Sequence, residues 1–335
     1  MLNGNRLQLL VLSKNLVDGV YMKKALIIGL NNYPRAPLYG CVNDAKEIAS
    51  ILERNGDGSV NYAVKLVTDE HQSVDKASLK RLIKELFDAE DSVLLYFSGH
   101  GDVNSYGGYI VTPDFATYDE GISMDEILGI ANNSRARDKV IILDCCHSGK
   151  MGSSQIGHTN TSQIGQGLTI LTACKSDEVA FEKYGRGVFT SLLIEALEGG
   201  AADLCGNVTT GSIYWFVDKA LGPWEQRPVF KTNVNTYSPI RAVRPPIPLE
   251  TLRRLTEYFK DPTEEFNLDP TYEYTEKTAI AEHVIIFKDL QKMVSVGLVK
   301  PVGEEHMYYA ALHSKSCKLT VIGQCYWRFV SENRI

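Results

Sequence analysis

Two short stretches decide the fold: VLLYFSGHG at residues 93–101 and VIILDCCHSG at residues 140–149. Each begins with an unbroken run of apolar side chains and ends in small and polar residues around glycine. A short apolar run without alternation is typical of a strand that is buried on both faces, as in a parallel sheet. Both stretches therefore predict a buried strand that runs directly into a loop with reactive side chains.

Three more apolar runs of the same character occur along the chain, and helical patterns separate the runs. These further strands are expected at Ala25–Ile28, Val64–Val67 and Leu168–Ala173. The helices are expected at Asn43–Arg54, Lys76–Asp88, Met124–Ala131 and Gly187–Glu198. Alternating strands and helices form right-handed βαβ units. We therefore expect an α/β fold with a doubly wound, mostly parallel sheet of about six strands flanked by helices.

The loops after the two deciding strands carry His100, Cys145 and Cys146. Ligands of an open α/β sheet bind beyond the carboxyl ends of its strands, so both loops deliver their side chains to one edge. There an imidazole can accept a thiol proton, and backbone amides near Gly101 and Cys146 can hold an oxyanion. A single histidine is more often structural and a single cysteine more often packs in the core, but the combination favours catalysis.

The same segments resemble the caspase–metacaspase superfamily of cysteine proteases, in its bacterial form. The resemblance rests on YFSGHG at 96–101 and LDCCHSG at 143–149, with Cys146 46 positions after His100, near the caspase spacing. Further matches are ALIIGLNNY at 25–33, GCVNDA at 40–45, LTACKSDEVAFE at 171–182, GVFT at 187–190 and QRPVF at 226–230. The similarity covers about residues 22–240 and implies a caspase-like peptidase domain over 22–244.

Carried over residue by residue, the resemblance makes His100 the general base and Cys146 the nucleophile, with oxyanion amides from Gly101 and Cys146. Cys145 fills a variable position and is expected to pack in the core. His147 adjoins the nucleophile on the same turn, so a structural role is favoured over a catalytic one. A zinc site on Cys145, Cys146 and His147 lacks a second pair of ligands at suitable spacing.

The substrate pocket is also implied by the resemblance. Asp44 and Asp144 match the two positions that line an acidic pocket for Arg or Lys in metacaspase-like proteases, and Cys41 and Ser98 are the other expected substrate-binding residues. Taken alone, Asp44 would be interpreted as a helix N-terminal residue, favoured there by capping and the helix dipole. Asp144 ends a buried strand, where a carboxylate needs a partner.

The alternative to a basic specificity is cleavage after aspartate. Aspartate-cleaving caspases need a basic pocket; Arg35 lies near the relevant loop, but Leu38 stands where an arginine would be expected. We therefore predict an endopeptidase that cleaves after Arg, then Lys, with an Asp-specific protease as the alternative.

Some metacaspases need calcium, which prefers about six to eight oxygen ligands. Asp125 and Glu126 are present here, but Met124 and Ser153 stand where further carboxylates would be expected. We therefore expect no cofactor, and weak or no dependence on calcium.

The overall composition excludes some classes of protein. A formal net charge of -6 over 335 residues argues against general nucleic-acid binding, which needs a basic face. No apolar run approaches the roughly 20 residues that span a bilayer, so no membrane association is expected. Seven scattered cysteines suit a reducing cytosol, which predicts a cytoplasmic protein. Residues 1–21 read as a leader of uncertain structure.

A second domain is expected after the stiff proline segment PPIP at 245–248. Beyond it the sequence suggests two helices, a Gly-Leu-Val closure of the second helix, and a β-wing. These features are Leu249–Lys260, Thr278–Val296, Gly297–Val299, and Tyr308–Leu312 with Lys318–Ile322. Their order resembles winged-helix domains and predicts a small α+β regulatory domain over 245–335.

The charge of this second domain decides what it is expected to bind. Residues 245–335 hold eleven Lys and Arg against thirteen Asp and Glu, about -2 overall. The presumed recognition helix carries Glu282, Lys288, Asp289 and Lys292, a balanced set rather than a phosphate-facing stripe. A protein partner is therefore favoured over DNA. A winged-helix regulator with a caspase-fold sensor remains the alternative function.

Overall fold

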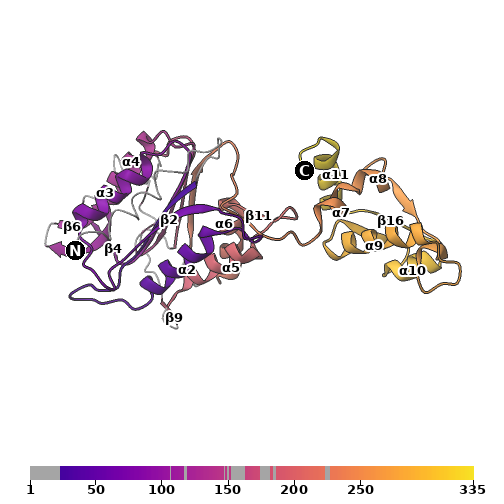
Figure 1. The fold of residues 1–335 in the computed structure, drawn as a ribbon, viewed down its shortest axis with the longest axis horizontal. Coiled ribbons are helices and arrows are strands. Elements are labelled where there is room, and N and C mark those ends of the chain that lie inside the picture. The colour runs from indigo at the N-terminus through magenta and orange to yellow at the C-terminus, as the bar shows by residue number, and fades with distance from the viewer. Residues whose placement is uncertain are drawn as a thin grey trace, which may run out of the picture. The chain divides into compact units, whose positions relative to one another are not determined.

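The computed structural model describes residues 23–105, 107–116, 119–146, 148, 151, 163–173, 182–183, 186–222 and 227–335. The expected leader, His147, Ser153 and most of residues 149–162 lie outside this described part. The chain divides into two compact units, Met1–Ala201 with Val208–Ala242 and Ala202–Asn207 with Val243–Ile335 (Figure 1). No helix of the described residues is long and apolar enough to cross a bilayer.

The first unit is built on a six-stranded sheet in the order β12-β8-β7-β3-β1-β2. Its strands are β1 (Lys23–Gly29), β2 (Tyr62–Thr68), β3 (Ser92–Ser98), β7 (Asp138–Asp144), β8 (Leu168–Thr172) and β12 (Val229–Asn233). Neighbouring strands run parallel except β12, which is antiparallel to β8. The prediction of a mostly parallel sheet of about six strands is confirmed.

Helices cover both faces of this sheet, as Figure 1 shows: α3 and α4 lie on one face, and α2, α5 and α6 on the other. They are α2 (Cys41–Glu53), α3 (Lys76–Phe87), α4 (Met124–Asn133), α5 (Val188–Glu195), which continues as a π-turn over Ala196–Gly200, and α6 (Thr210–Ala220). All seven residues of β3 are buried, as expected for a central strand covered on both faces.

A small antiparallel sheet follows β3 and was not predicted from the sequence. It consists of β4 (Gly101–Asn104), β5 (Gly107–Ala116) and β6 (Asp119–Ser123), in the order β4-β5-β6. Its strands are interrupted by glycines and polar residues, so no continuous apolar run marks them. Because β4 begins directly after His100, this sheet holds the segment that follows His100 in place.

The second unit combines short helices with a three-stranded antiparallel sheet in the order β14-β16-β15. Its elements are α7 (Leu249–Arg253), α8 (Leu255–Tyr258), β14 (Glu265–Asn267), η4 (Pro270–Tyr272), α9 (Ala281–Ser295), β15 (Val299–Val302), α10 (Met307–Leu312), β16 (Ser316–Leu319) and α11 (Val321–Ser331). Gly297, at φ +75°, ends α9: the Leu298 N–H donates to Met293 and the Gly297 N–H to Val294. This left-handed closure is the reason for glycine there.

The β-wing predicted in this unit is wrong. Tyr308–Leu312 lies in helix α10, which buries Met307, Ala310 and Ala311 at helical spacing. The segment Lys318–Ile322 is strand only as far as Leu319. Thr320 then caps α11, because its side chain accepts the Gly323 N–H. The predicted helix Leu249–Lys260 is likewise two short helices, and the winged-helix likeness of the whole unit stays a prediction.

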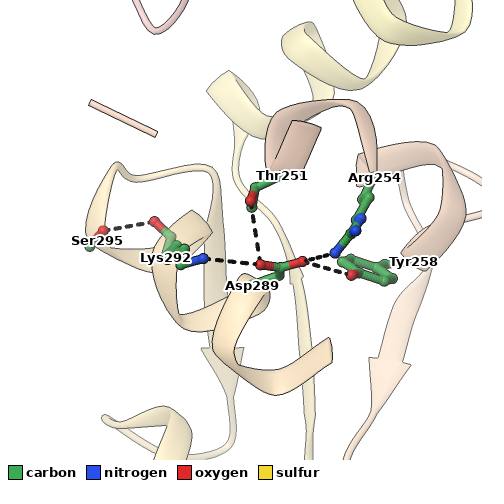
Figure 2. Close-up of polar contacts among 6 residues, drawn as sticks. All are labelled: Thr251, Arg254, Tyr258, Asp289, Lys292 and Ser295. Carbon is green, nitrogen blue, oxygen red and sulfur yellow. Dashed lines mark hydrogen bonds and ion pairs between the residues drawn. The ribbon is translucent and has the colours of Figure 1, made fainter. Parts of the chain in front are cut away.

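Asp289, which the sequence analysis counted among the balanced charges of the presumed recognition helix, is a buried residue of α9. It is only 4% exposed and joins α9 to the start of the unit (Figure 2). Its carboxylate accepts hydrogen bonds from Arg254 at 2.6 Å, Tyr258 at 3.0 Å, and Thr251 and Lys292 at 3.3 Å. Burial acts to raise the pKa of Asp289, but these donors outweigh it and hold the pKa below 3.8.

Candidate active site

The strand register brings His100 and Cys146 to one edge of the sheet. Strands β3 and β7 are parallel neighbours, and Ser98 pairs with Asp144 at their carboxyl ends. His100 and Cys146 each lie two residues beyond this pair. The N–H of Gly99, the residue before His100, donates to the Asp144 carbonyl oxygen at 3.3 Å. Since paired strands lie about 4.8 Å apart, the two loops leave the sheet as immediate neighbours.

His100 is held by the loop that follows β1. Its Nε2 lies 2.7 Å from the carbonyl oxygen of Ala36, which can only accept a hydrogen bond. Nε2 therefore carries the hydrogen in the neutral ring, and Nδ1 is left as the basic nitrogen. The Tyr33 hydroxyl accepts the His100 N–H and donates to the Val111 carbonyl oxygen, both at 3.1 Å. The Tyr33 and His100 rings also meet edge to face, 4.5 Å between centroids.

The two cysteines after β7 differ in exposure. Cys145 is 1% exposed and belongs to the hydrophobic core, while Cys146 is partly exposed. The predicted packing role of Cys145 agrees with this burial. Gly101 lies against the Cys146 backbone so closely that any side chain at 101 would overlap the Cys146 carbonyl oxygen. Glycine at this position therefore lets the His100 and Cys146 loops approach each other.

Asp44 and Asp144 meet around Gly187. The Gly187 N–H donates to Asp44 Oδ2 at 3.0 Å. A methyl group at position 187 would overlap Asp144 Oδ2 and come within 3.2 Å of Asp44 Oδ2. Both carboxylates are buried, at 1% and 5% exposure. The structure thus brings together two acids that are 100 positions apart in sequence.

A chain of hydroxyl groups supports Asp144. The Thr190 hydroxyl donates to Asp144 Oδ2 at 2.7 Å. Because that hydrogen is used, the Tyr96 hydroxyl must donate to Thr190 Oγ1, at 2.6 Å. Burial raises the pKa of Tyr96 well above 10, and the charges of Asp144 and Asp44 add to the effect. Tyr96 is therefore a neutral donor that holds this network in place.

Several of these supporting residues were not predicted from the sequence. Asp69, at the end of β2, accepts the N–H groups of Asn31 and Asn32 at 3.0 and 2.6 Å, which anchors the loop that carries Tyr33 and Ala36. Only buried polar character after a strand could have indicated Asp69. Tyr33, Gly187 and Thr190 lie inside motifs of the sequence analysis, but nothing in those motifs shows which group each one contacts.

The remaining predicted residues have these positions. Cys41 begins α2 and Ser98 ends β3, and both are buried. Arg35 is exposed, whereas Leu38 packs against the hydrophobic core. Asp125 and Glu126 occupy the first turn of α4, and Glu126 pairs with Lys80 at 2.5 Å. Within the described ranges, no three His, Cys, Asp or Glu side chains gather as a metal site.

Residues 22–237 match the family model described as the caspase domain. The chain belongs to the caspase-domain family. Metacaspase-2 of Trypanosoma brucei brucei is 26% identical over 219 residues, which cover 54% of this chain and 62% of that protein. Metacaspase-1A of Aspergillus terreus is 31% identical over 146 residues, 38% of this chain and 36% of the relative. The chain thus spans about six tenths of the trypanosome protein's length.

Among solved structures, a protein of Geobacter sulfurreducens matches 67% of this chain and all of its own length. The TM-score is 0.49 and the sequence identity 17%. The family match ends at residue 237, before the second unit resumes at Val243.

Proposed function

We propose that this chain is a cysteine endopeptidase of the cytoplasm that cleaves after basic residues, Arg in preference to Lys. Cys146 is the nucleophile, and His100 takes its proton through Nδ1 and returns it to the leaving amine. The backbone N–H groups of Gly101 and Cys146 bind the oxyanion of the tetrahedral intermediate. The single observation that supports this proposal is the pairing of Ser98 with Asp144, because the loops that carry the two reactive residues start from these neighbouring strand ends.

Specificity for a basic side chain rests on the two acids around Gly187. Two carboxylates at one point can pair with a guanidinium through charge-assisted hydrogen bonds, and Arg matches this geometry better than Lys. A carboxylate accepts more than one hydrogen bond at each oxygen, so Gly187 and Thr190 can keep their contacts while a substrate binds. An Asp side chain would meet two like charges at the same place.

We also propose that the enzyme needs no cofactor and little or no calcium, and that the second unit regulates it by binding a protein. The near-balanced charge of residues 245–335 supports a protein partner over DNA. Glu126, a candidate calcium ligand, already has Lys80 as its ion-pair partner.

The test is hydrolysis of three peptides that differ only in Arg, Lys or Asp before the cleaved bond, with calcium and with a chelator. Cys146→Ala and His100→Ala should each abolish cleavage, and Cys325→Ala, a thiol in α11, should not. Asp144→Asn should lower kcat/KM for the Arg peptide by roughly thirtyfold or more, from about 2–5 kcal/mol of lost pairing. Faster cleavage of the Asp peptide than of the Arg peptide would refute the basic specificity.

A further inference from the structure

A hollow of about 540 Å³ lies in the first unit at the amino end of β7. Its wall includes Ser134–Lys139, the run that enters this strand, and Gln166 and Gly167 beside it. The volume lies within the range of small-molecule sites. Because His100 and Cys146 follow the carboxyl ends of parallel strands, this hollow is at the opposite edge of the sheet from the candidate active site.

The wall of this hollow is positively charged, although the whole chain is acidic. Arg135, Arg137 and Lys139 alternate along one six-residue stretch, and Asp138 is the one acid in the wall. Asp138 Oδ2 accepts from Arg137 Nε at 3.0 Å and from the hydroxyls of Ser92 and Ser238 at 3.1 and 2.9 Å. By side-chain count the wall therefore has three cations and one acid, an excess of two.

Arg135 has one ion pair outside the hollow, and that pair is weak. Its guanidinium lies 3.5 Å from Glu90, and both side chains are 77% exposed. An exposed pair of this kind contributes little to stability, since water screens it. Arg135 can therefore turn toward a ligand in the hollow at little cost.

Lys139 is the feature that points to a ligand. It is only 4% exposed, and within the described chain its ammonium donates one hydrogen bond, to the Ser134 carbonyl oxygen at 3.5 Å. That distance exceeds the usual 2.7–3.2 Å, and an ammonium has three donors. A Cβ atom added to Gly167 would lie 3.8 Å from the Lys139 Nζ, so this ammonium lies close to both Ser134 and Gly167 of the wall. Burial lowers the pKa of Lys139, as expected for a cation short of partners.

We propose that this hollow binds a small phosphate-bearing anion, with the Lys139 ammonium and the Arg135 and Arg137 guanidinium groups as its ligands. A phosphate monoester carries close to two negative charges at neutral pH, which matches the excess of two in the wall. Guanidinium groups bind phosphate oxygens in pairs, and lysine adds a point charge. A single carboxylate would leave one of these charges unmatched. Inorganic phosphate and a nucleotide share this chemistry.

The test is calorimetric titration of the full chain with inorganic phosphate and, separately, with ATP at constant ionic strength. We expect saturable binding of at least one of them, and the stronger titrant distinguishes free phosphate from a nucleotide. Lys139→Met, which keeps the length of the side chain, should weaken this binding by roughly thirtyfold or more. Lys65→Met is the matched control, since Lys65 on β2 is 60% exposed and outside the hollow.

A second variant covers the case in which Lys139→Met does not fold. Arg135→Gln removes an exposed side chain and should leave the thermal unfolding temperature unchanged while it weakens phosphate or ATP binding several-fold. Absence of saturable binding of both titrants to the unmodified chain at millimolar concentration would overturn the proposal. Equal binding by the unmodified chain and a folded Lys139→Met variant would overturn it as well.

Discussion

Replacing Gly187 by alanine tests how closely the two acids are packed. The backbone at 187 has φ -65° and ψ 131°, which any residue adopts, so the substitution introduces no backbone strain. The added methyl group would overlap Asp144 Oδ2 and press on Asp44 Oδ2. Neither carboxylate can simply move away, because Thr190 and the Gly187 N–H hold them. The expected effect is therefore steric and local.

The magnitude follows from the cost of overpacking a buried site, about 1–3 kcal/mol. For a unit of this size, 1 kcal/mol corresponds to about 2–4 °C in Tm, so a mid-range cost of about 2 kcal/mol lowers Tm by about 4–8 °C. The charge-assisted hydrogen bond from Gly187 to Asp44 would also lengthen, which adds to the loss. Cleavage of an Arg peptide should fall at the same time, since both acids are displaced.

Differential scanning calorimetry measures this change, and Gly129→Ala is the matched control. Gly129 lies inside α4 of the same unit, with open space where its Cβ would be. Alanine there should raise the Tm of the same transition, since it favours helix by up to about 1 kcal/mol. The reasoning is refuted if Gly187→Ala unfolds at the temperature of the unmodified chain while Gly129→Ala shifts upward.

Two further predictions concern cysteine reactivity and acid stability. Iodoacetamide at pH 8 should modify Cys146 before Cys145, which is 1% exposed, and before Cys317, whose pKa is raised by burial to about 12. Peptide mass spectrometry measures the order of modification. Earlier modification of Cys145 than of Cys146 would contradict the prediction. Asp289 has a lowered pKa, so its stabilising effect is present above about pH 4 and is lost as pH falls through the folded-state pKa. Asp289→Asn should therefore lower the free energy of unfolding by roughly 1–3 kcal/mol at pH 7. Between pH 7 and pH 3 the variant should lose less of this free energy than the unmodified chain, as measured by urea unfolding at both pH values. An equal loss in the two proteins would exclude Asp289 as the group responsible.

The sequence predicted the central sheet well because buried parallel strands leave an unmistakable apolar run. It also predicted that the loops after β3 and β7 share an edge, since parallel topology requires it. It could not predict the Ala36 carbonyl at His100, because a backbone group has no residue type to recognise. The prediction of a β-wing was wrong for a different reason. Tyr308–Leu312 is short and apolar, and such a run fits a strand or a buried helix turn equally well.

The residues of the candidate active site come from stretches of the chain that are far apart, from Tyr33 to Thr190. A chain growing from the ribosome therefore contains His100 and Cys146 before it contains Gly187 and Thr190, which hold the two acids. Strand β12, at the edge of the sheet, is made later still. Parallel strands pair slowly, because each crossover must close before its contacts form. For the proposed protease, this order of synthesis would postpone the first cleavage until the first unit is fully made and would protect the nascent chain from its own thiol.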